Sequence, residues 1–289
     1  MPSVNTAQTA QTEETFQNGA ARLYRRSIFP LNQPRARLLI IHGYGDHSGR
    51  YAHFMQWMAE HEIACEAVDL RGQGRSPGRR GAINRWEDYL DDVQAFFDRC
   101  ESPDSPPLPR FLLGHSHGGL IVSAMAERGL LNPRTFHGII LTSPFFKACL
   151  AVPVWKRMLS GAVGRLFPSL HISTGLQPEW MSSDPAMIED SRSDPLLARV
   201  ATPRWYVEHR AAQHRAMNEA SLFTHPLLCL AGGADPIADA MVAEEFVARA
   251  GSQDKTFRLY PGFRHEILRE ARREEIFQAI HGWMGEHLG

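Results

Sequence analysis

The pentapeptide Gly114-His115-Ser116-His117-Gly118 constrains the fold of this chain more than any other feature. It directly follows the apolar run Phe111–Leu113 and opens a helix-like stretch from Gly119 onward. The pattern Gly-x-Ser-x-Gly between a strand and a helix is typical of a nucleophile elbow, a sharp turn that holds a serine hydroxyl clear of a sheet. Glycine permits the tight bend, and the serine becomes a nucleophile only when a neighbouring base takes its proton. The motif therefore predicts an α/β architecture with a nucleophile at Ser116.

Strand-like apolar runs alternate with helical patterns along most of the chain. This alternation indicates a mostly parallel sheet that helices cover on both faces. An antiparallel hairpin, turned at Asn18-Gly19, is expected before this series. The predicted strands are Leu38–Ile41, Ile63–Val68, Phe111–Leu113, Gly138–Leu141, Leu227–Leu230 and Thr256–Tyr260, and the predicted helices span Tyr51–Glu60, Trp86–Arg99, the stretch after Gly118 and Glu266–Leu288.

The strand series is interrupted by a long stretch with helical patterns and frequent prolines. We expect residues 1–13 to form a disordered tail, residues 14–144 and 226–289 to form the α/β core, and residues 145–225 to form a helical cap inserted into it. Within the cap, Phe146–Phe167 combines apolar side chains with scattered Lys and Arg. Two interpretations remain open for it: a lid that transiently contacts a lipid surface, or a roof packed over an apolar pocket.

The composition argues against a nucleic-acid-binding, membrane-spanning or secreted protein. The chain has 31 Lys and Arg against 32 Asp and Glu, so it lacks the strong field that attracts nucleic acid. No apolar run approaches the roughly 18 residues that cross a bilayer, and the first residues do not resemble a secretory signal. Cys65 and Cys229 lie in apolar runs, as expected of buried thiols in a reducing compartment. We therefore expect a cytoplasmic protein without a nucleic-acid partner.

Two candidate partners of Ser116 follow later strands. Asp235 comes after Leu227–Leu230, and His265 comes after the strand that ends at Tyr260. Sites in open α/β sheets lie beyond the carboxyl ends of the strands, and the order Ser, Asp, His matches that of the α/β-hydrolases. His265 would take the serine proton, and Asp235 would fix its tautomer and stabilise the imidazolium.

Asp239 is the rival for the acid position. We interpret it as the N-cap of a helix through Val242–Ala250, because aspartate is favoured at that position.

Acyl transfer also needs donors for the negative charge that develops on the substrate oxygen. We predict the backbone N–H groups of Tyr44, in the loop after Leu38–Ile41, and of His117, directly after the nucleophile. Two such donors contribute several kcal/mol to transition-state stabilisation. The side chain of His117 has two open interpretations: it covers the elbow, or it touches the leaving group.

Neither a metal nor a cofactor is predicted. His42, His47 and His53 are too irregularly spaced and too poor in carboxylate partners for a metal site. The glycine-rich segment Arg71–Gly81 lacks both the Gly-Lys-Ser/Thr signature and the Rossmann spacing. We interpret it as a tight loop beside the site.

Five stretches, in order along the chain, resemble the monoacylglycerol lipase/lysophospholipase family of α/β-hydrolases: His42–Tyr51, Val68–Ser76, Gly114–Gly119, Ser193–Leu196 and Tyr260–His265. The resemblance extends from about residue 14 to the C-terminus. It implies an eight-stranded sheet, a cap inserted after the sixth strand, and hydrolysis of esters that carry a single fatty-acyl chain. The family's triad falls on Ser116, Asp235 and His265, and its oxyanion donors fall on Tyr44 and His117.

The sequence is compatible with three functions. The leading one is a serine hydrolase whose substrate is a small lipid ester, either a monoacylglycerol or a lysophospholipid. The second is a short-chain esterase, thioesterase, amidase or peptidase on the same triad, and the third is a non-catalytic ligand-binding homologue. Epoxide hydrolase and dehalogenase chemistry is disfavoured, because position 116 is serine rather than aspartate.

Overall fold

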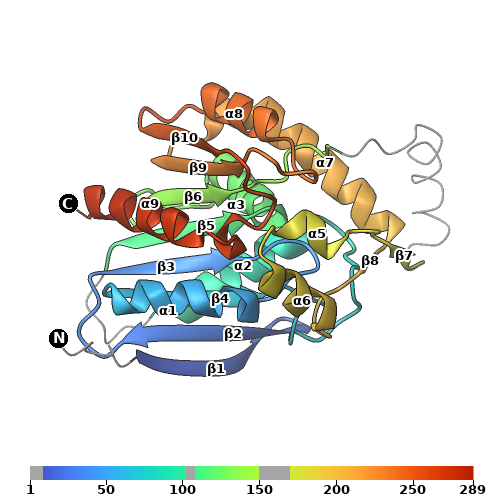
Figure 1. Ribbon diagram of the computed structural model, residues 1–289, viewed down its shortest axis with the longest axis horizontal. Coiled ribbons are helices and arrows are strands. Elements are labelled where there is room, and N and C mark those ends of the chain that lie inside the picture. The colour runs from blue at the N-terminus through green and yellow to red at the C-terminus, as the bar shows by residue number, and fades with distance from the viewer. Residues whose placement is uncertain (1–8, 102–107, 150–169, 289) are drawn as a thin grey trace.

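An eight-stranded sheet in the order β1-β2-β4-β3-β5-β6-β9-β10 forms the centre of the computed structural model, which describes residues 9–101, 108–149 and 170–288 (Figure 1). The pairs β1–β2 and β2–β4 are antiparallel, and the other neighbouring pairs are parallel. The predicted eight-stranded, mostly parallel sheet is therefore confirmed. Its strands are β1 (Thr9–Asn18), β2 (Ala21–Pro30), β3 (Ala36–Ile41), β4 (Ile63–Asp69), β5 (Arg110–His115), β6 (Phe136–Thr142), β9 (Leu227–Gly232) and β10 (Lys255–Tyr260).

The N-terminal hairpin turns at the predicted place but begins earlier than predicted. Asn18 pairs with Ala21, and Gly19 adopts a φ of 55° that glycine accepts without strain. Residues 9–13, which we assigned to a disordered tail, belong to β1. That part of the strand is polar and mostly exposed, so it carries no hydrophobic alternation, and it is held instead by ion pairs such as Glu13–Arg26 at 2.9 Å. Residues 1–8 lie outside the described residues.

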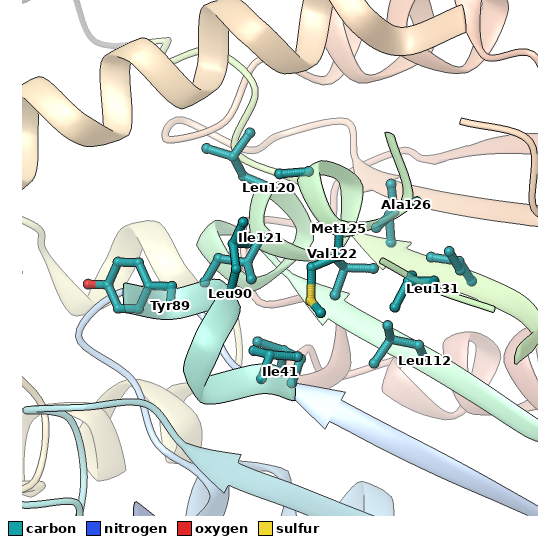
Figure 2. Packing of buried hydrophobic residues seen from close by; sticks show 14 of the residues in the cluster. Ile41, Tyr89, Leu90, Leu112, Leu120, Ile121, Val122, Met125, Ala126 and Leu131 are labelled. Atoms are coloured by element: carbon teal, nitrogen blue, oxygen red, sulfur yellow. The ribbon is translucent and has the colours of Figure 1, made fainter. Parts of the chain in front are cut away.

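Helices cover both faces of the sheet, because side chains of each buried strand alternate between two cores. Leu39 and Ile41 of β3 pack with α2 and α3, whereas Leu38 and Ile40 pack with α1 and α9. Figure 2 shows Val122 and Met125 of α3 close to Leu112 of β5 in the first core. These helices are α1 (Ala52–Glu60), α2 (Glu87–Cys100), α3 (His117–Glu127) and α9 (Arg273–Glu286), and α8 (Ala240–Arg249) packs beside β9 and β10.

A mainly helical insertion connects β6 to β9. Each of its three described α-helices begins with proline at the first turn, where the missing N–H and the fixed φ are tolerated. Figure 1 shows α5 and α6 beyond the carboxyl ends of the strands. Most of the predicted lid Phe146–Phe167 lies outside the described residues. The insertion contains β7 (Ile172–Ser173), α5 (Pro178–Met181), α6 (Pro185–Ser193), β8 (Val200–Ala201), α7 (Pro203–Glu219) and the 3-10 turn η2 (Ala220–Leu222).

The longest of the described helices is α7, with 17 residues. None of the helices in the described ranges is both long and apolar enough to cross a membrane.

The C-terminal helix begins later than predicted. The chain after His265 forms a 3-10 turn, η3 (Ile267–Arg269), and α9 starts only at Arg273. Glu266 is held by an ion pair to Arg50 at 2.6 Å, and the Glu270 carboxylate accepts a 2.7 Å hydrogen bond from the backbone N–H of Arg264. These contacts bind the segment to the core, so a continuous helix from Glu266 does not form.

Leucine truncation tests the core beneath the elbow. Leu112 is fully buried, so Leu112→Ala should lower the free energy of unfolding by about 2–5 kcal/mol, through lost burial and a residual cavity. Leu130 is 46% exposed, and Leu130→Ala should cost less than about 0.5 kcal/mol. Urea denaturation of both variants measures the difference. Equal losses in the two variants would contradict this description of the core.

Candidate active site

Ser116 lies in the sharp turn between β5 and α3. Its backbone has φ 53° and ψ −114°, a conformation that costs a non-glycine residue about 1–3 kcal/mol. A Cβ on Gly114 would lie 2.7 Å from the carbonyl oxygen of Gly118, and a Cβ on Gly118 would collide with the carbonyl oxygen of Ile41 in β3. Both glycines of the motif are therefore needed for close packing of helix, turn and sheet.

The structure brings the three predicted residues together from the ends of β5, β9 and β10. His265 Nε2 lies 2.8 Å from Ser116 Oγ, and His265 Nδ1 lies 2.7 Å from Asp235 Oδ2. The other carboxylate oxygen of Asp235 accepts hydrogen bonds from the N–H groups of Ile237 and Ala238, at 2.7 and 3.0 Å. Ser116 and His265 are both almost completely buried. The carboxylate is thus fixed on one side and aligns the imidazole with the serine on the other.

The electrostatics favour His265 as a base. Burial alone would lower the pKa of His265, but the charge of Asp235 and its hydrogen bond outweigh this and raise the pKa above the ordinary value. The imidazolium that forms when Ser116 loses its proton is therefore stabilised in place.

The rival acid takes the structural role that we predicted for it. Asp239 is the N-cap of α8, and its carboxylate accepts a 3.2 Å hydrogen bond from the N–H of Met241. It also pairs with Lys147 at 3.1 Å. The carboxylate beside His265 is therefore that of Asp235.

The two predicted oxyanion donors belong to segments that meet at the elbow. The loop after β3 packs on the turn, because a Cβ on Gly43 would lie 3.4 Å from the Cβ of Ser116. Tyr44 follows directly. His117 is the first residue of α3, where backbone N–H groups have no partner within the helix. The role of the Tyr44 and His117 N–H groups as oxyanion donors stays a prediction.

The side chain of His117 points into the interface between α3 and α7. Its Nδ1 lies 3.1 Å from Nδ1 of His209, and the rings of Tyr44 and Trp86 meet its ring edge-on. Burial lowers the pKa of His117 well below its ordinary value and that of His209 to about 3, so both rings are neutral. Sequence reasoning did not identify His209. Its spacing of four from Trp205, on one face of a helix, was the available signal.

A small cavity of about 10 Å³, room for a single water molecule, lies among residues that include the sequence neighbours of Ser116 and His265. It is lined by Asp46, Arg50, Tyr51, His115 and Glu266, together with Leu268 and Arg269. Arg50 is almost fully buried and pairs with Asp46 at 3.0 Å and with Glu266 at 2.6 Å. Burial opposes ionisation of Asp46, but Arg50 outweighs it and holds the pKa of Asp46 at about 2. Asp46, Arg50 and Tyr51 belong to the His42–Tyr51 motif, which gave no sign that they line a cavity.

The three N-terminal histidines have separate partners. His42 accepts a hydrogen bond from the N–H of Leu70, His47 pairs with Asp194, and His53 contacts the carbonyl of Leu268. No cluster of three or more His, Cys, Asp or Glu side chains suited to a metal occurs within the described ranges.

The glycine-rich segment is a tight loop next to the predicted donor Tyr44. Gly72 and Gly74 adopt φ values of 66° and 48°, and Asp69 accepts a 2.7 Å hydrogen bond from the N–H of Arg75. The carbonyl of Gly81 lies 3.3 Å from the Tyr44 hydroxyl.

A serine, histidine and aspartate hydrogen-bonded in sequence at the carboxyl ends of this sheet define a serine hydrolase of the α/β-hydrolase class. A family model described as "Serine aminopeptidase, S33" matches residues 32–272. Phospholipase YtpA of Bacillus subtilis is 31% identical over 89% of this chain and 98% of its own length. Monoacylglycerol lipase of Mycolicibacterium smegmatis is 27% identical over 97% of this chain and 99% of its own.

The crystal structure of Paleococcus ferrophilus monoacylglycerol lipase aligns with a TM-score of 0.81 and 29% identity, over 92% of this chain and 99% of that one. The chain belongs to the monoacylglycerol lipase/lysophospholipase family of α/β-hydrolases, within the group that the S33 model describes. It is a carboxylic ester hydrolase.

The Asp235–His265 pair should control the pH dependence. Only neutral His265 can accept the Ser116 proton, so the rate should fall as the pH drops through a pKa raised above the ordinary imidazole value of about 6.5. Asp235→Asn removes the carboxylate. This change should move the acidic side of the pH–rate profile to lower pH and reduce kcat by about 10⁴-fold. The rate at which a fluorophosphonate labels Ser116, measured against pH, reports both effects. Asp239→Asn is the matched control and should leave the midpoint unchanged; a shift in that variant instead would make Asp239 the acid.

Proposed function

We propose that the protein hydrolyses esters with one fatty-acyl chain, such as monoacylglycerols and lysophospholipids, through an acyl-enzyme on Ser116. The hydrogen-bonded chain from Ser116 through His265 to Asp235 is the observation that carries the proposal. Relatives named monoacylglycerol lipase and phospholipase, aligned over nearly their whole length, support the substrate class.

Acylation begins when His265 Nε2 takes the proton of Ser116 Oγ as this oxygen attacks the ester carbonyl carbon. The carbonyl oxygen becomes an oxyanion and accepts hydrogen bonds from the N–H groups of Tyr44 and His117. His265 then gives its proton to the alcohol oxygen, and the bond between that oxygen and the acyl carbon breaks. Water repeats the attack on the acyl-enzyme, with His265 again as the base, and releases the fatty acid.

The insertion, residues 145–225, acts as a cap on a core formed by residues 14–144 and 226–289. Backbone hydrogen bonds from Glu266 to the carbonyl of Met181 and from Ala198 to the carbonyl of Gly45 support this division. Transient contact of the cap with a lipid surface remains a prediction. A cytoplasmic location is also proposed, and the buried free thiols Cys65, Cys100 and Cys229 support it.

Chain-length profiling tests the substrate class. For 4-nitrophenyl esters from acetate to palmitate, kcat/KM should rise by up to about fourfold per buried methylene, which corresponds to about 0.8 kcal/mol. Ser116→Ala should abolish turnover at every length. Ser123→Ala, a matched serine on α3 whose hydroxyl donates to the carbonyl of Gly119, should retain it.

Three outcomes would redirect the proposal. A maximum at acetate would indicate a small-molecule esterase. Preferential cleavage of aminoacyl 4-nitroanilides would indicate a peptidase. Ser116-independent turnover would refute the proposed nucleophile.

A further inference from the structure

The loop that carries the first predicted oxyanion donor is hydrogen-bonded to the insertion at two adjacent residues, Tyr44 and Gly45. The Tyr44 hydroxyl donates a 2.8 Å hydrogen bond to the carbonyl of Val200 in β8. One residue further along, the carbonyl of Gly45 accepts a 2.8 Å hydrogen bond from the N–H of Ala198. Both attachments follow the backbone N–H of Tyr44 directly along the chain. Gly43 and Gly45 flank Tyr44, and Gly45 adopts a φ of 74°, so the loop has little stiffness of its own.

The start of α7 is hydrogen-bonded to the carbonyl of Gly81, which also accepts a hydrogen bond from the Tyr44 hydroxyl. Thr202 is the N-cap of this helix, and both its N–H and its hydroxyl reach the carbonyl of Gly81, at 3.1 and 3.2 Å. The Trp205 ring, one turn into the helix, lies with its centroid 3.8 Å from that of Tyr44. The phenol is therefore held at its tip by β8 and along its face by α7.

The residue of the second donor is attached to the same helix. His117 and His209 approach with their Nδ1 atoms 3.1 Å apart, and both side chains are almost fully buried. Because both rings are neutral, one Nδ1–H donates to the other nitrogen. His209 is in turn stacked on Trp205, with a centroid distance of 4.7 Å and an angle of 15° between the planes. One face of α7 thus contacts the side chains of both predicted donor residues.

We propose that residues 198–209 of the insertion position the oxyanion hole, with the Tyr44 hydroxyl and His209 as positioning residues. The inference rests on the proposed function, because it takes the Tyr44 and His117 N–H groups as the donors. A donor stabilises the oxyanion only within hydrogen-bond distance of where that charge develops, so small displacements of either backbone segment reduce the rate. The insertion then contributes to the chemical step as well as to substrate enclosure.

Two variants remove one attachment each and leave both backbone N–H groups in place. Tyr44→Phe deletes the hydroxyl that bonds to Val200 but keeps the ring against Trp205. His209→Leu deletes the partner of His117. Each should lower kcat by about tenfold with KM changed less than about twofold, since complete loss of one donor costs about 10²–10³. His209→Asn offers a hydrogen-bonding atom near the Nδ1 position and should restore most of the rate.

A tetrahedral-intermediate analogue separates positioning from a merely structural role. A long-chain trifluoromethyl ketone adds to Ser116 and forms an oxyanion, so its inhibition constant should rise in parallel with the loss of kcat/KM. The inhibition constant of a long-chain alcohol of the same length, which neither adds to Ser116 nor carries a negative oxygen, should stay constant. Tyr206→Phe is the matched control, because it deletes a half-buried hydroxyl from the same helix and should leave all three quantities unchanged.

The outcomes distinguish this inference from the proposed function. Unchanged kcat and unchanged ketone binding in both variants, with turnover still dependent on Ser116, would overturn the inference alone. The inference would also be overturned if the variants lost only thermal stability, or if KM changed as much as kcat. Turnover that survives Ser116→Ala would refute the proposed function itself.

Discussion

The close approach of α3 to β3 at Gly118 is the contact on which the active site depends. The carbonyl of Ile41 occupies the space that a side chain at position 118 would need. This packing holds the first turn of α3 against the sheet and Ser116 in its unfavourable backbone conformation. Since Ile41 is also the last residue of β3, the chain runs from this contact directly into Gly43 and Tyr44. One tight contact therefore sets the nucleophile and the proposed oxyanion loop side by side.

The insertion is attached to both halves of the proposed machinery by different kinds of interaction. On the side of the base, a buried guanidinium connects them: Arg50 pairs with Glu266, the neighbour of His265, and donates to the hydroxyl of Ser191 in α6. Removing one partner of such a buried pair is costly, because the other charge remains without compensation. On the side of the oxyanion, the links are neutral hydrogen bonds and ring contacts to β8 and α7. The insertion is thus bound to the rest of the chain on both sides of the reacting serine.

Local and topological rules predicted much of this arrangement. The elbow, the order of its partners and the strand ends follow from short-range signals, because parallel strands present their carboxyl ends at one edge. The features that the sequence did not predict depend on contacts between residues far apart in the chain. The break after His265 arises from Arg50 and from hydrogen bonds to Glu270, which no helical periodicity records. The first part of β1 is polar and exposed, so pairing with β2 rather than side-chain pattern makes it a strand. His209 gains its significance only when α7 packs on α3.

Four histidines at or near the site differ in pKa because their surroundings differ. Burial lowers the pKa of His115 to about 4 and that of His209 to about 3, and it lowers the pKa of His117 well below the ordinary value. His265 is equally enclosed, yet its pKa is raised, because it alone of these four bonds to a carboxylate. The Ser116 proton therefore has one favourable destination among several nearby nitrogens. The neutrality of His115 also matters, because its ring centroid lies 5.1 Å from that of His265, and a positive charge there would weaken the base.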